Sequence, residues 1–329
     1  MASNRTSKII RRIERDAGVP NLSKILVDRV KPTDLQSLLL ETYRRVVQRR
    51  SPGTIFSDYV SNRFTLPSQS DPATLLEWDR LAFSHLPDGF HAIELSPVSP
   101  IGSASCVAPV SQDWVLTTIR NMEVVSDPTN MLALECALRR QKFTRSEPTN
   151  PTPVHLACSH RAVRAQRYQS PSSRQHFRLF SLCSAGRDTG NLQFELQAMA
   201  QHIGFYLESV RAFLEPTIPL RVTINPLSSS TRNSQALTST LAKLKREFDQ
   251  VDISIEEAKS RTTYYQQLRF HIHAGPKGTS ETELVDGGDT DWTRKFLNNA
   301  KERLIISGIG SERLCEKFMP HSSHIRDKP

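Results

Sequence analysis

The residues best suited to bind a ligand lie near the C-terminal end of the sequence. The apolar residues 304–306 are followed by Ser307-Gly308-Ile309-Gly310-Ser311-Glu312-Arg313-Leu314. Two glycines where a strand meets a helix let the backbone approach a ligand closely, and Arg313 adds a guanidinium to the first helical turn. This pattern suits a nucleotide phosphate. A tight turn with a surface arginine is the alternative interpretation, because the string by itself is short.

Two other groups of residues have chemically useful types. His271 and His273 alternate on a predicted strand and therefore face the same side, as two metal ligands would, but no third ligand stands at a usable spacing. A packed histidine pair is the simpler interpretation. Cys106 lies among small residues and has the chemistry of a nucleophile, but no general base is identifiable, so a buried thiol is favoured. The metal ligands, if any, are therefore unknown from the sequence.

Length, charge and cysteine content exclude several classes of protein. The chain has 329 residues with 43 Lys and Arg against 34 Asp and Glu, a net charge of +9. Five cysteines without a CxxC pair argue against a disulfide framework and against a structural zinc site. No long apolar run and no signal-peptide pattern is present, so we expect a cytoplasmic protein without a membrane span.

The first seventy residues predict an accessory helical segment. Ile9, Ile10 and Ile13 recur at helical spacing, a second helix is expected from an Asn21 N-cap, and a third over residues 33–47. Arginines occupy the polar faces, at positions 11, 12, 15, 44, 45, 49 and 50. They form either a surface that contacts phosphates or an ordinary solvated helix face.

The rest of the chain predicts an α+β domain over residues 71–320, followed by a polar tail over 321–329. A capped helix begins after Asp71-Pro72, and short strands and helices then follow without a regular alternation. Such irregular order favours α+β over a doubly wound sheet.

The string at 307–314 resembles motif 3 of class II aminoacyl-tRNA synthetases, in particular the histidyl-tRNA synthetase branch, whose motif reads G-[IL]-G-x-E-R-L. Other pieces stand in that family's order over residues 71–318. Residues 71–97 are similar to the helix and motif 1 strand that form the family's dimer interface. The resemblance implies a class II antiparallel sheet flanked by helices, and a homodimer.

The segment 124–129 is similar to the branch's L-R-P-E-G-T element. The resemblance places Asp127 where the family has the glutamate that receives the α-amino group of the substrate, and Thr129 matches the threonine. A helix N-cap is an alternative role for Asp127, and it is physically sufficient by itself.

Residues 176–180, a loop and residues 193–195 look like motif 2. The resemblance implies that Arg178 grips the α-phosphate of ATP and that Phe194 stacks on adenine, with Arg187 and Glu195 assigned to the same nucleotide site. Phe180 replaces the glutamate of the motif. Gly308, Gly310 and Arg313 complete the expected ATP site.

Two further elements resemble the family's substrate-reading segments. Arg261, Tyr264 and Tyr265 are similar to the R-G-L-D-Y-Y element. Gly287 and Gly288 keep the glycines of the G-G-R-Y-D-G-L element, whose arginine and tyrosine are replaced here. The resemblance therefore implies a substrate site whose histidine-reading residues have changed.

The resemblance implies a ligase that activates an amino acid or a similar carboxylate as its adenylate, using ATP and Mg²⁺, with Arg178 and Arg313 as the catalytic residues. The chain ends shortly after motif 3, so a complete tRNA-charging enzyme is not expected, and the acceptor would be a carrier protein, a small amine or RNA. Two alternatives stay open. One is a non-catalytic paralogue that acts as a regulatory, ligand-sensing subunit, and the other is an RNA-binding module.

Overall fold

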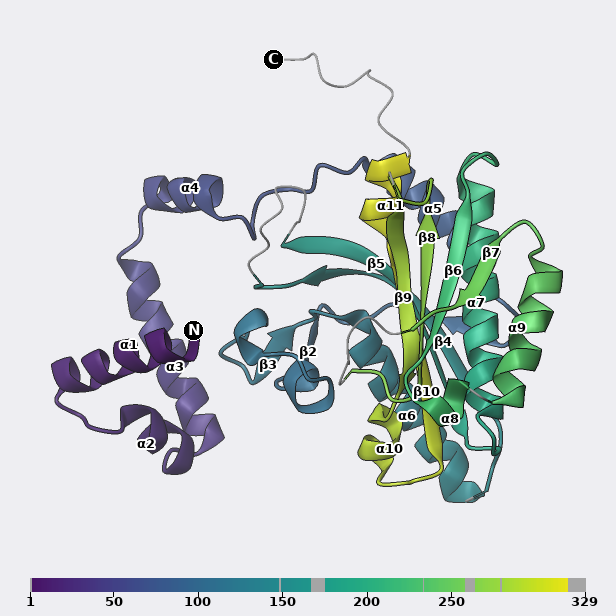
Figure 1. The fold of residues 1–329 in the computed structure, drawn as a ribbon. Coiled ribbons are helices and arrows are strands. Elements are labelled where there is room, and N and C mark those ends of the chain that lie inside the picture. Colours follow the sequence, from purple (N-terminus) through teal and green to yellow (C-terminus); the bar gives the residue numbers. More distant parts are fainter. Residues whose placement is uncertain are drawn as a thin grey trace, which may run out of the picture. The chain divides into compact units, whose positions relative to one another are not determined.

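The computed structural model describes residues 2–147, 149–166, 175–232, 234–257, 264–278 and 280–318 (Figure 1). By its contacts the chain divides into two compact units, Met1–Leu66 with Thr117–Met122, and Pro67–Leu116 with Glu123–Pro329. The sequence predicted a boundary at 70–71.

The first unit consists mainly of helices. They are α1 (Ala2–Ala17), α2 (Leu22–Asp28), α3 (Pro32–Gln48) and α4 (Pro52–Ser61). Proline begins α3 and α4, and the Ser51 side chain caps α4 in a capping box with Thr54. Asn21 precedes α2 in a left-handed conformation and makes no side-chain cap, so its predicted capping role is wrong. No side chain of α2, α3 or α4 is buried.

The second unit is built on an eight-stranded sheet in the order β1-β4-β5-β10-β9-β8-β6-β7. Only the outermost strands, β1 and β7, pair with their neighbours in parallel. The predicted α+β class is therefore confirmed. The strands are β1 (Phe90–Ala92), β4 (Val154–Val163), β5 (His176–Arg187), β6 (Leu220–Pro226), β7 (Asp252–Ile255), β8 (Leu268–Ala274), β9 (Thr282–Thr290) and β10 (Glu302–Gly310). A two-stranded sheet pairs β2 (Val98–Pro100) with β3 (Met122–Val124).

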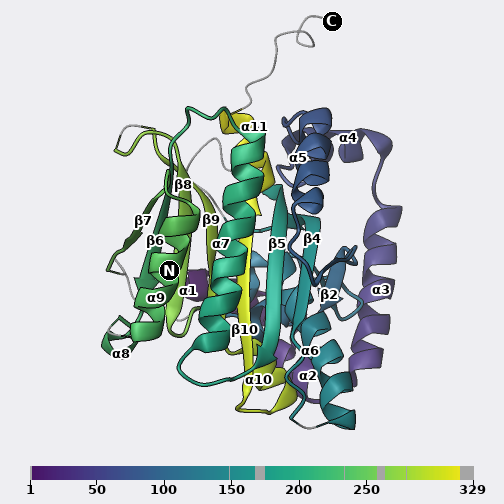
Figure 2. The ribbon, with the colours of Figure 1, turned by 90° about the vertical axis from the view of Figure 1, so that its right-hand side faces the viewer.

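Helices cover both faces of the large sheet. On one face α7 (Gln193–Phe213) lies across β5 and β10, as Figure 2 shows, and packs in one cluster with α5 (Pro72–Ser84), α9 (Gln235–Glu247) and α11 (Ser311–Phe318). On the other face α6 (Pro128–Ser146) and α10 (Trp292–Leu297) form a second cluster. Short helical turns occur at Ser103–Val107, Gln112–Trp114 and Ser229–Arg232.

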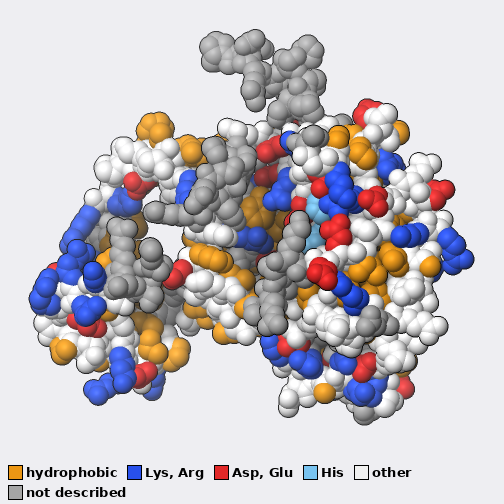
Figure 3. Space-filling view, viewed as in Figure 1, with side chains coloured by type: hydrophobic (Ala, Val, Ile, Leu, Met, Phe, Trp, Pro, Cys, Tyr) orange, Lys and Arg blue, Asp and Glu red, His pale blue; other side chains and the backbone are white. Residues whose placement is uncertain are grey.

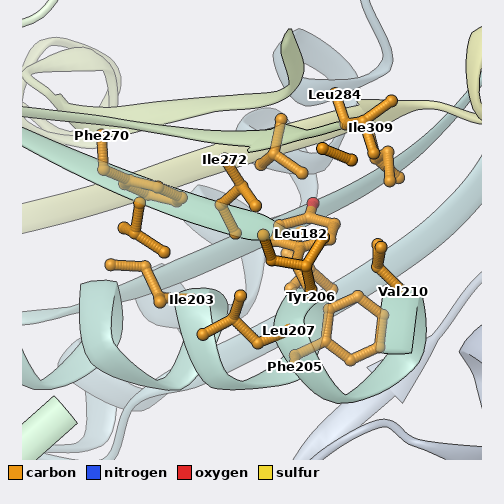
Figure 4. Close-up of a cluster of buried hydrophobic side chains, with 14 of the residues drawn as sticks. Leu182, Ile203, Phe205, Tyr206, Leu207, Val210, Phe270, Ile272, Leu284 and Ile309 are labelled. Atoms are coloured by element: carbon orange, nitrogen blue, oxygen red, sulfur yellow. The ribbon is translucent and has the colours of Figure 1, made fainter. Parts of the chain in front are cut away.

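The alternation of β5 explains how one strand serves two cores. Phe180 and Leu182 belong to the cluster around α7, whereas Cys183 and Ala185 belong to the cluster around α6. In Figure 4, Leu182 of β5 and Phe270 and Ile272 of β8 lie over the apolar side chains of α7. Side chains from distant strands therefore meet on one helix, and the fold depends on non-local contacts.

A buried ion pair connects α6 to the start of β10. Arg140 donates from Nε to Glu302 Oε2 at 3.0 Å and from Nη2 to Glu302 Oε1 at 2.9 Å, and both side chains are fully buried. The remaining donors of Arg140 bond the carbonyls of Thr152 and Asn150. Two carbonyls and one carboxylate thus satisfy a charge that water cannot reach.

Replacing Arg140 by Gln leaves the Glu302 carboxylate buried without its partner. We expect the free energy of unfolding to fall by about 3–5 kcal/mol in urea titrations. Arg139→Gln is the matched control, because the neighbouring Arg139 pairs with Glu135 at the surface of the same helix. That change should cost under about 1 kcal/mol. Equal losses in the two variants would contradict the role given to the buried pair.

A chain of hydrogen bonds runs through the core beneath α7. His155 Nδ1 lies 2.7 Å from Ser184 Oγ, which lies 2.8 Å from His202 Nε2. His202 Nδ1 lies 2.8 Å from Ser307 Oγ, and this hydroxyl donates to Tyr206. Burial lowers the pKa of His202 to about 3 and that of His155 to about 4. Both imidazoles are therefore neutral hydrogen-bonding groups at neutral pH.

These histidines make stability depend on pH below their unfolded pKa of about 6.5. Between pH 6.5 and 4 the unfolded chain takes up protons that the folded chain excludes, so stability falls as pH decreases, by about 1.4 kcal/mol per pH unit for each histidine. We expect His202→Gln to reduce the slope of unfolding free energy against pH by that amount. An unchanged slope between pH 6 and 5 would contradict this assignment.

Candidate functional site

A cleft with a volume of about 1210 Å³ opens on the second unit, on the face of the sheet where α6 begins. Strands β5, β8, β9 and β10 contribute to its wall, together with the segments that precede α6 and follow β4. Arginines and carboxylates both line it. The cleft therefore suits a ligand that carries more than one kind of charge.

Asp127 lies at one end of the cleft as the N-cap of α6. Its Oδ1 accepts hydrogen bonds from the backbone N–H and the hydroxyl of Thr129, at 3.0 and 2.7 Å. Its Oδ2 accepts from Tyr264 Oη at 3.3 Å and from Arg164 Nη2 at 3.5 Å. Burial raises the pKa of Tyr264 well above its usual value, so this hydroxyl stays a donor. Asp127 therefore caps α6 with Oδ1 and bonds the side chains of the cleft with Oδ2.

A second carboxylate, Asp286 of β9, forms the neighbouring part of the wall. Tyr265 donates to Asp286 Oδ2 and Arg269 Nε donates to Asp286 Oδ1, each at 3.0 Å. The guanidinium of Arg269 also lies over the Tyr265 ring, 5.7 Å from its centroid. Burial raises the pKa of Asp286. Arg269 and Asp286 were not identified from the sequence, because only the pairing of β8 with β9 brings them together.

The strand–helix junction predicted near the C-terminus is confirmed. β10 ends at Gly310, α11 begins at Ser311, and both Gly308 and Gly310 line the cleft. Arg313 is exposed at the cleft and donates from Nη1 to the carbonyl of Glu283 at 3.0 Å. Its guanidinium is therefore accessible to a ligand.

Glu312, next to Arg313, is 3% exposed and has two differently used oxygens. Its Oε1 accepts from Arg161 Nη2 at 2.6 Å and from Ser68 Oγ at 3.0 Å. Its Oε2 has no hydrogen-bond partner among the described atoms. Glu312 and Glu316 both line the cleft, so α11 contributes two carboxylates to it.

Several solved structures have a fold similar to that of this chain. A histidyl-tRNA synthetase from S. aureus matches with a TM-score of 0.54 and 14% identity, over 77% of this chain and 70% of that chain. An ATP phosphoribosyltransferase regulatory subunit/histidyl-tRNA synthetase from Bacillus halodurans matches at 0.56 and 12%, over 76% and 81%. A histidine–tRNA ligase subunit from Alicyclobacillus acidocaldarius matches at 0.52 and 13%, over 75% and 94%.

The second unit has a histidyl-tRNA synthetase-like catalytic-domain fold. The resemblance noted in the sequence is thus confirmed for the fold. Comparison of the sequence itself matches no protein-family model and no curated protein. The likeness to the synthetases is therefore one of fold, at 12–14% identity.

Within this synthetase-like fold the cleft brings together a large part of the predicted site. Its lining includes Asp127, Thr129, Tyr264, Tyr265, Arg178, Gly308, Gly310 and Arg313. Gly287 and Gly288 lie behind it in β9, where a Cβ on Gly287 would meet Phe270 and one on Gly288 would lie 2.6 Å from Tyr265 Cδ1. Gly288 thus leaves room for the ring of Tyr265, and Gly287 leaves room for the ring of Phe270. Arg261 lies outside the described residues.

The structure contradicts the prediction that Phe194 lies beside Arg178 in one nucleotide site. Residues 193–195 follow Arg187, the last residue of β5. Arg178 lies nine residues earlier in the same strand, and at ~3.3 Å per residue this places Arg187 about 30 Å from Arg178. Phe194 packs on Gly186, Glu195 pairs with Arg303 Nε at 2.9 Å, and neither they nor Arg187 line the cleft. Phe194 and Arg178 therefore cannot hold the adenine and α-phosphate of one nucleotide.

Arg178 itself faces the other side of the strand. It shares the face of Phe180, which packs between Trp78 and Phe205, and its Nη1 pairs with Asp79 of α5. Asp79 also accepts from Ser159 Oγ at 2.8 Å. Arg178 thus reaches only the rim of the cleft, and its charge already has a partner.

Arg164 and Phe177, which were not identified from the sequence, lie close together in the cleft. They flank the hairpin between β4 and β5, closed by the bond from Arg164 N to Gln175 O at 2.7 Å. Both line the cleft, and the Arg164 guanidinium lies 5.0 Å from the centroid of the Phe177 ring. Arg164 Nε also donates to Ser126 O at 2.9 Å. In the sequence, residues 154–163 alternate as a strand does, and this strand ends directly before Arg164. That strand end was the signal that could have identified Arg164 and Phe177.

The remaining candidates from the sequence are the pair His271 and His273, and Cys106. His271 Nδ1 lies 3.2 Å from Glu283 Oε2, and the His271 and His273 rings are 5.9 Å apart. Within the described ranges no group of three His, Cys, Asp or Glu residues could hold a metal. Cys106 is exposed, so the expectation of a buried thiol is wrong. No described helix is long and apolar enough to cross a membrane.

Gly288 is closely surrounded and Gly308 is not, so replacing each by alanine should affect stability differently. Gly288→Ala overlaps Tyr265 and the backbone of Leu268, and should lower the free energy of unfolding by about 1–3 kcal/mol through overpacking. Gly308→Ala is the matched control. Its nearest atom would be Ser181 Oγ at 3.4 Å, so a loss under about 1 kcal/mol is expected in urea titrations. The reverse order would contradict the assigned packing.

Proposed function

We propose that the cleft binds ATP together with an amino acid or a related small carboxylate, and joins them as an acyl-adenylate. The observation that carries the proposal is the convergence of Asp127, Phe177, Arg164 and Arg313 on one cleft. These residues supply a carboxylate for an amine, an aromatic surface for a base, and two guanidiniums for phosphates.

The positions of these side chains in the cleft support the role proposed for each of them. Phe177 stacks on adenine and Arg164 contacts the α-phosphate, in place of Phe194 and Arg178. Arg313 neutralises the outer phosphates, and Asp127 Oδ2 receives the amine. Arg178 is paired with Asp79, so Arg164 and Arg313 supply the positive charge for the phosphates.

The reaction is an in-line displacement at the α-phosphorus. A carboxylate oxygen of the substrate forms a bond to this phosphorus while the bond from phosphorus to the bridging oxygen breaks, and pyrophosphate leaves with that oxygen. Negative charge develops on the non-bridging and leaving oxygens, where Arg164 and Arg313 stabilise it by several kcal/mol. Asp127 contributes by orienting the substrate.

Magnesium is the metal that this proposal implies. The unpartnered Oε2 of Glu312 and the carboxylate of Glu316 are hard oxygen donors at the cleft, and Mg²⁺ commonly uses one or two carboxylates together with substrate phosphates. Glu312 and Glu316 would hold it. When bound, the ion supplies charge neutralisation of the triphosphate.

A second candidate function is ligand sensing without catalysis, and one observation favours it. Arg164 covers a face of Phe177 and also reaches Asp127, so one side chain contacts both the proposed adenine site and the proposed amine site. A ligand must displace it, as expected of a sensor. The name of the Bacillus halodurans match includes a regulatory subunit.

The proposal also includes a homodimer and an acceptor for the acyl group, which would be a carrier-protein thiol, a small amine or RNA. The dimer would use the edge strand β1 and helix α5, on which Leu76 is 67% exposed. Light scattering of the purified chain gives its oligomeric state directly.

Exchange of labelled pyrophosphate into ATP tests the activity. We expect exchange that requires one carboxylate from a panel of amino acids and simple analogues, and that falls at least a hundredfold in Arg313→Ala and Arg164→Ala. Arg246→Ala, an exposed arginine of α9 outside the cleft, should retain wild-type exchange. No exchange with any acid, combined with thermal stabilisation by one of them, would contradict catalysis and favour the sensor.

A further inference from the structure

The charge of this chain is concentrated in its N-terminal helical unit. Residues 1–66 contain thirteen Lys and Arg against six Asp and Glu, so they carry +7 of the chain's net charge of +9. The much larger remainder is almost neutral. In the part of the chain that the structure describes, none of these thirteen basic residues lines the cleft, which lies entirely in the second unit.

The basic side chains of α1 form a continuous surface. Lys8, Arg12 and Arg15 recur at the spacing that places residues on one side of a helix, Arg11 lies beside them, and all four are exposed. Among the described residues, the one carboxylate in an ion pair with any of these four is Asp16, which lies 3.3 Å from Arg15. Most of this positive charge is therefore not neutralised within the unit.

Helix α3 adds a second basic surface. The side chains of Arg44 and Arg45 are 71% and 72% exposed, and both pair with the single carboxylate of Glu41, at 3.4 and 2.8 Å. Arg49 follows one turn later and is also exposed. Figure 3 shows Lys and Arg side chains over the helices of this unit on the face turned to the viewer.

The type of residue indicates the type of partner. Of the thirteen basic residues, ten are arginines. The planar guanidinium fork matches phosphate oxygens in pairs and is less strongly hydrated than an ammonium group, so arginine is favoured for phosphate recognition. We propose that the arginine-rich faces of α1 and α3 bind the phosphate backbone of RNA.

An anionic membrane is the main competitor, and α1 argues against it. Its large apolar side chains in the described part are Ile9, Ile10 and Ile13, whereas interfacial helices typically carry Trp, Phe or Leu on the apolar face. Phe56 and Tyr59 are exposed on α4, a helix that contains no Lys or Arg. The most basic helix and the most aromatic one are thus different helices.

Fluorescence anisotropy of the full chain with a labelled 20-nucleotide single-stranded RNA, titrated over a range of KCl concentrations, tests this surface. The test variant is Arg11→Glu/Arg12→Glu/Arg15→Glu, and the control is Lys243→Glu/Lys245→Glu/Arg246→Glu on exposed positions of α9. The two variants change the net charge equally. Glu and Arg have similar helix propensities, so circular dichroism should show unchanged helix content.

We expect the test variant to lose at least tenfold in affinity at moderate salt. The slope of log K against log salt should become shallower by about 2, since each lost phosphate contact removes ~0.7 for a single strand. The α9 control should stay within twofold of wild type. If the helix content of the test variant changes, Arg44→Gln/Arg45→Gln measures the same effect on α3.

Three outcomes would overturn the proposal. Wild-type chain that does not bind RNA contradicts it outright. Equal losses in the test and control variants would show that net charge alone attracts RNA. Cosedimentation with phosphatidylserine vesicles that is lost in the test variant, without RNA binding, would identify a membrane surface. Pyrophosphate exchange in the same variants should be unchanged, which separates this inference from the proposed activity.

Discussion

The site depends on the antiparallel pairing of β5 with β10. Nine consecutive residue pairs join them, from Glu302 opposite Arg187 to Gly310 opposite Leu179. A slip of one residue would move every side chain of one strand to the other face. The buried ion pair between Glu302 and Arg140 ties the first of these residues to α6. The same helix carries Asp127 at its N-terminus, so register and site are connected through one element.

This arrangement explains why the cleft can be polar while the sheet beneath it is apolar. One face of β5 and β10 packs on α7 through Leu182 and Ile309, and the other face continues from the α6 cluster into the cleft. Phe177 and Arg178 both contribute to the cleft lining, but Arg178 pairs with Asp79 of α5. Neighbouring residues in the sequence thus serve opposite purposes. The role proposed for each of these two side chains follows from the face of β5 on which it lies.

Arg164 is the residue on which the two candidate functions differ. It contacts the ring of Phe177, the carbonyl of Ser126 and the carboxylate of Asp127. An enzyme would transfer this guanidinium to a phosphate when ATP binds, whereas a sensor would use its displacement as the signal. Both roles require that the hairpin between β4 and β5 keep the arginine at the cleft. The basic faces of α1 and α3 are independent of this choice.

The sequence by itself determined the α+β class, the strand–helix junction at Gly310 and Ser311, and the resemblance to the synthetase fold, because these follow from periodicity, capping and short local strings. Only the tertiary structure decided that Phe194 lies far from Arg178. The string 176–180 matches the motif locally, but residues 193–195 lie beyond the far end of β5, and no local pattern reports that distance. Arg269 with Asp286, and Arg164 with Phe177, meet only through strand pairing. Such partners are set by the sheet, whose pairing joins residues far apart in the chain.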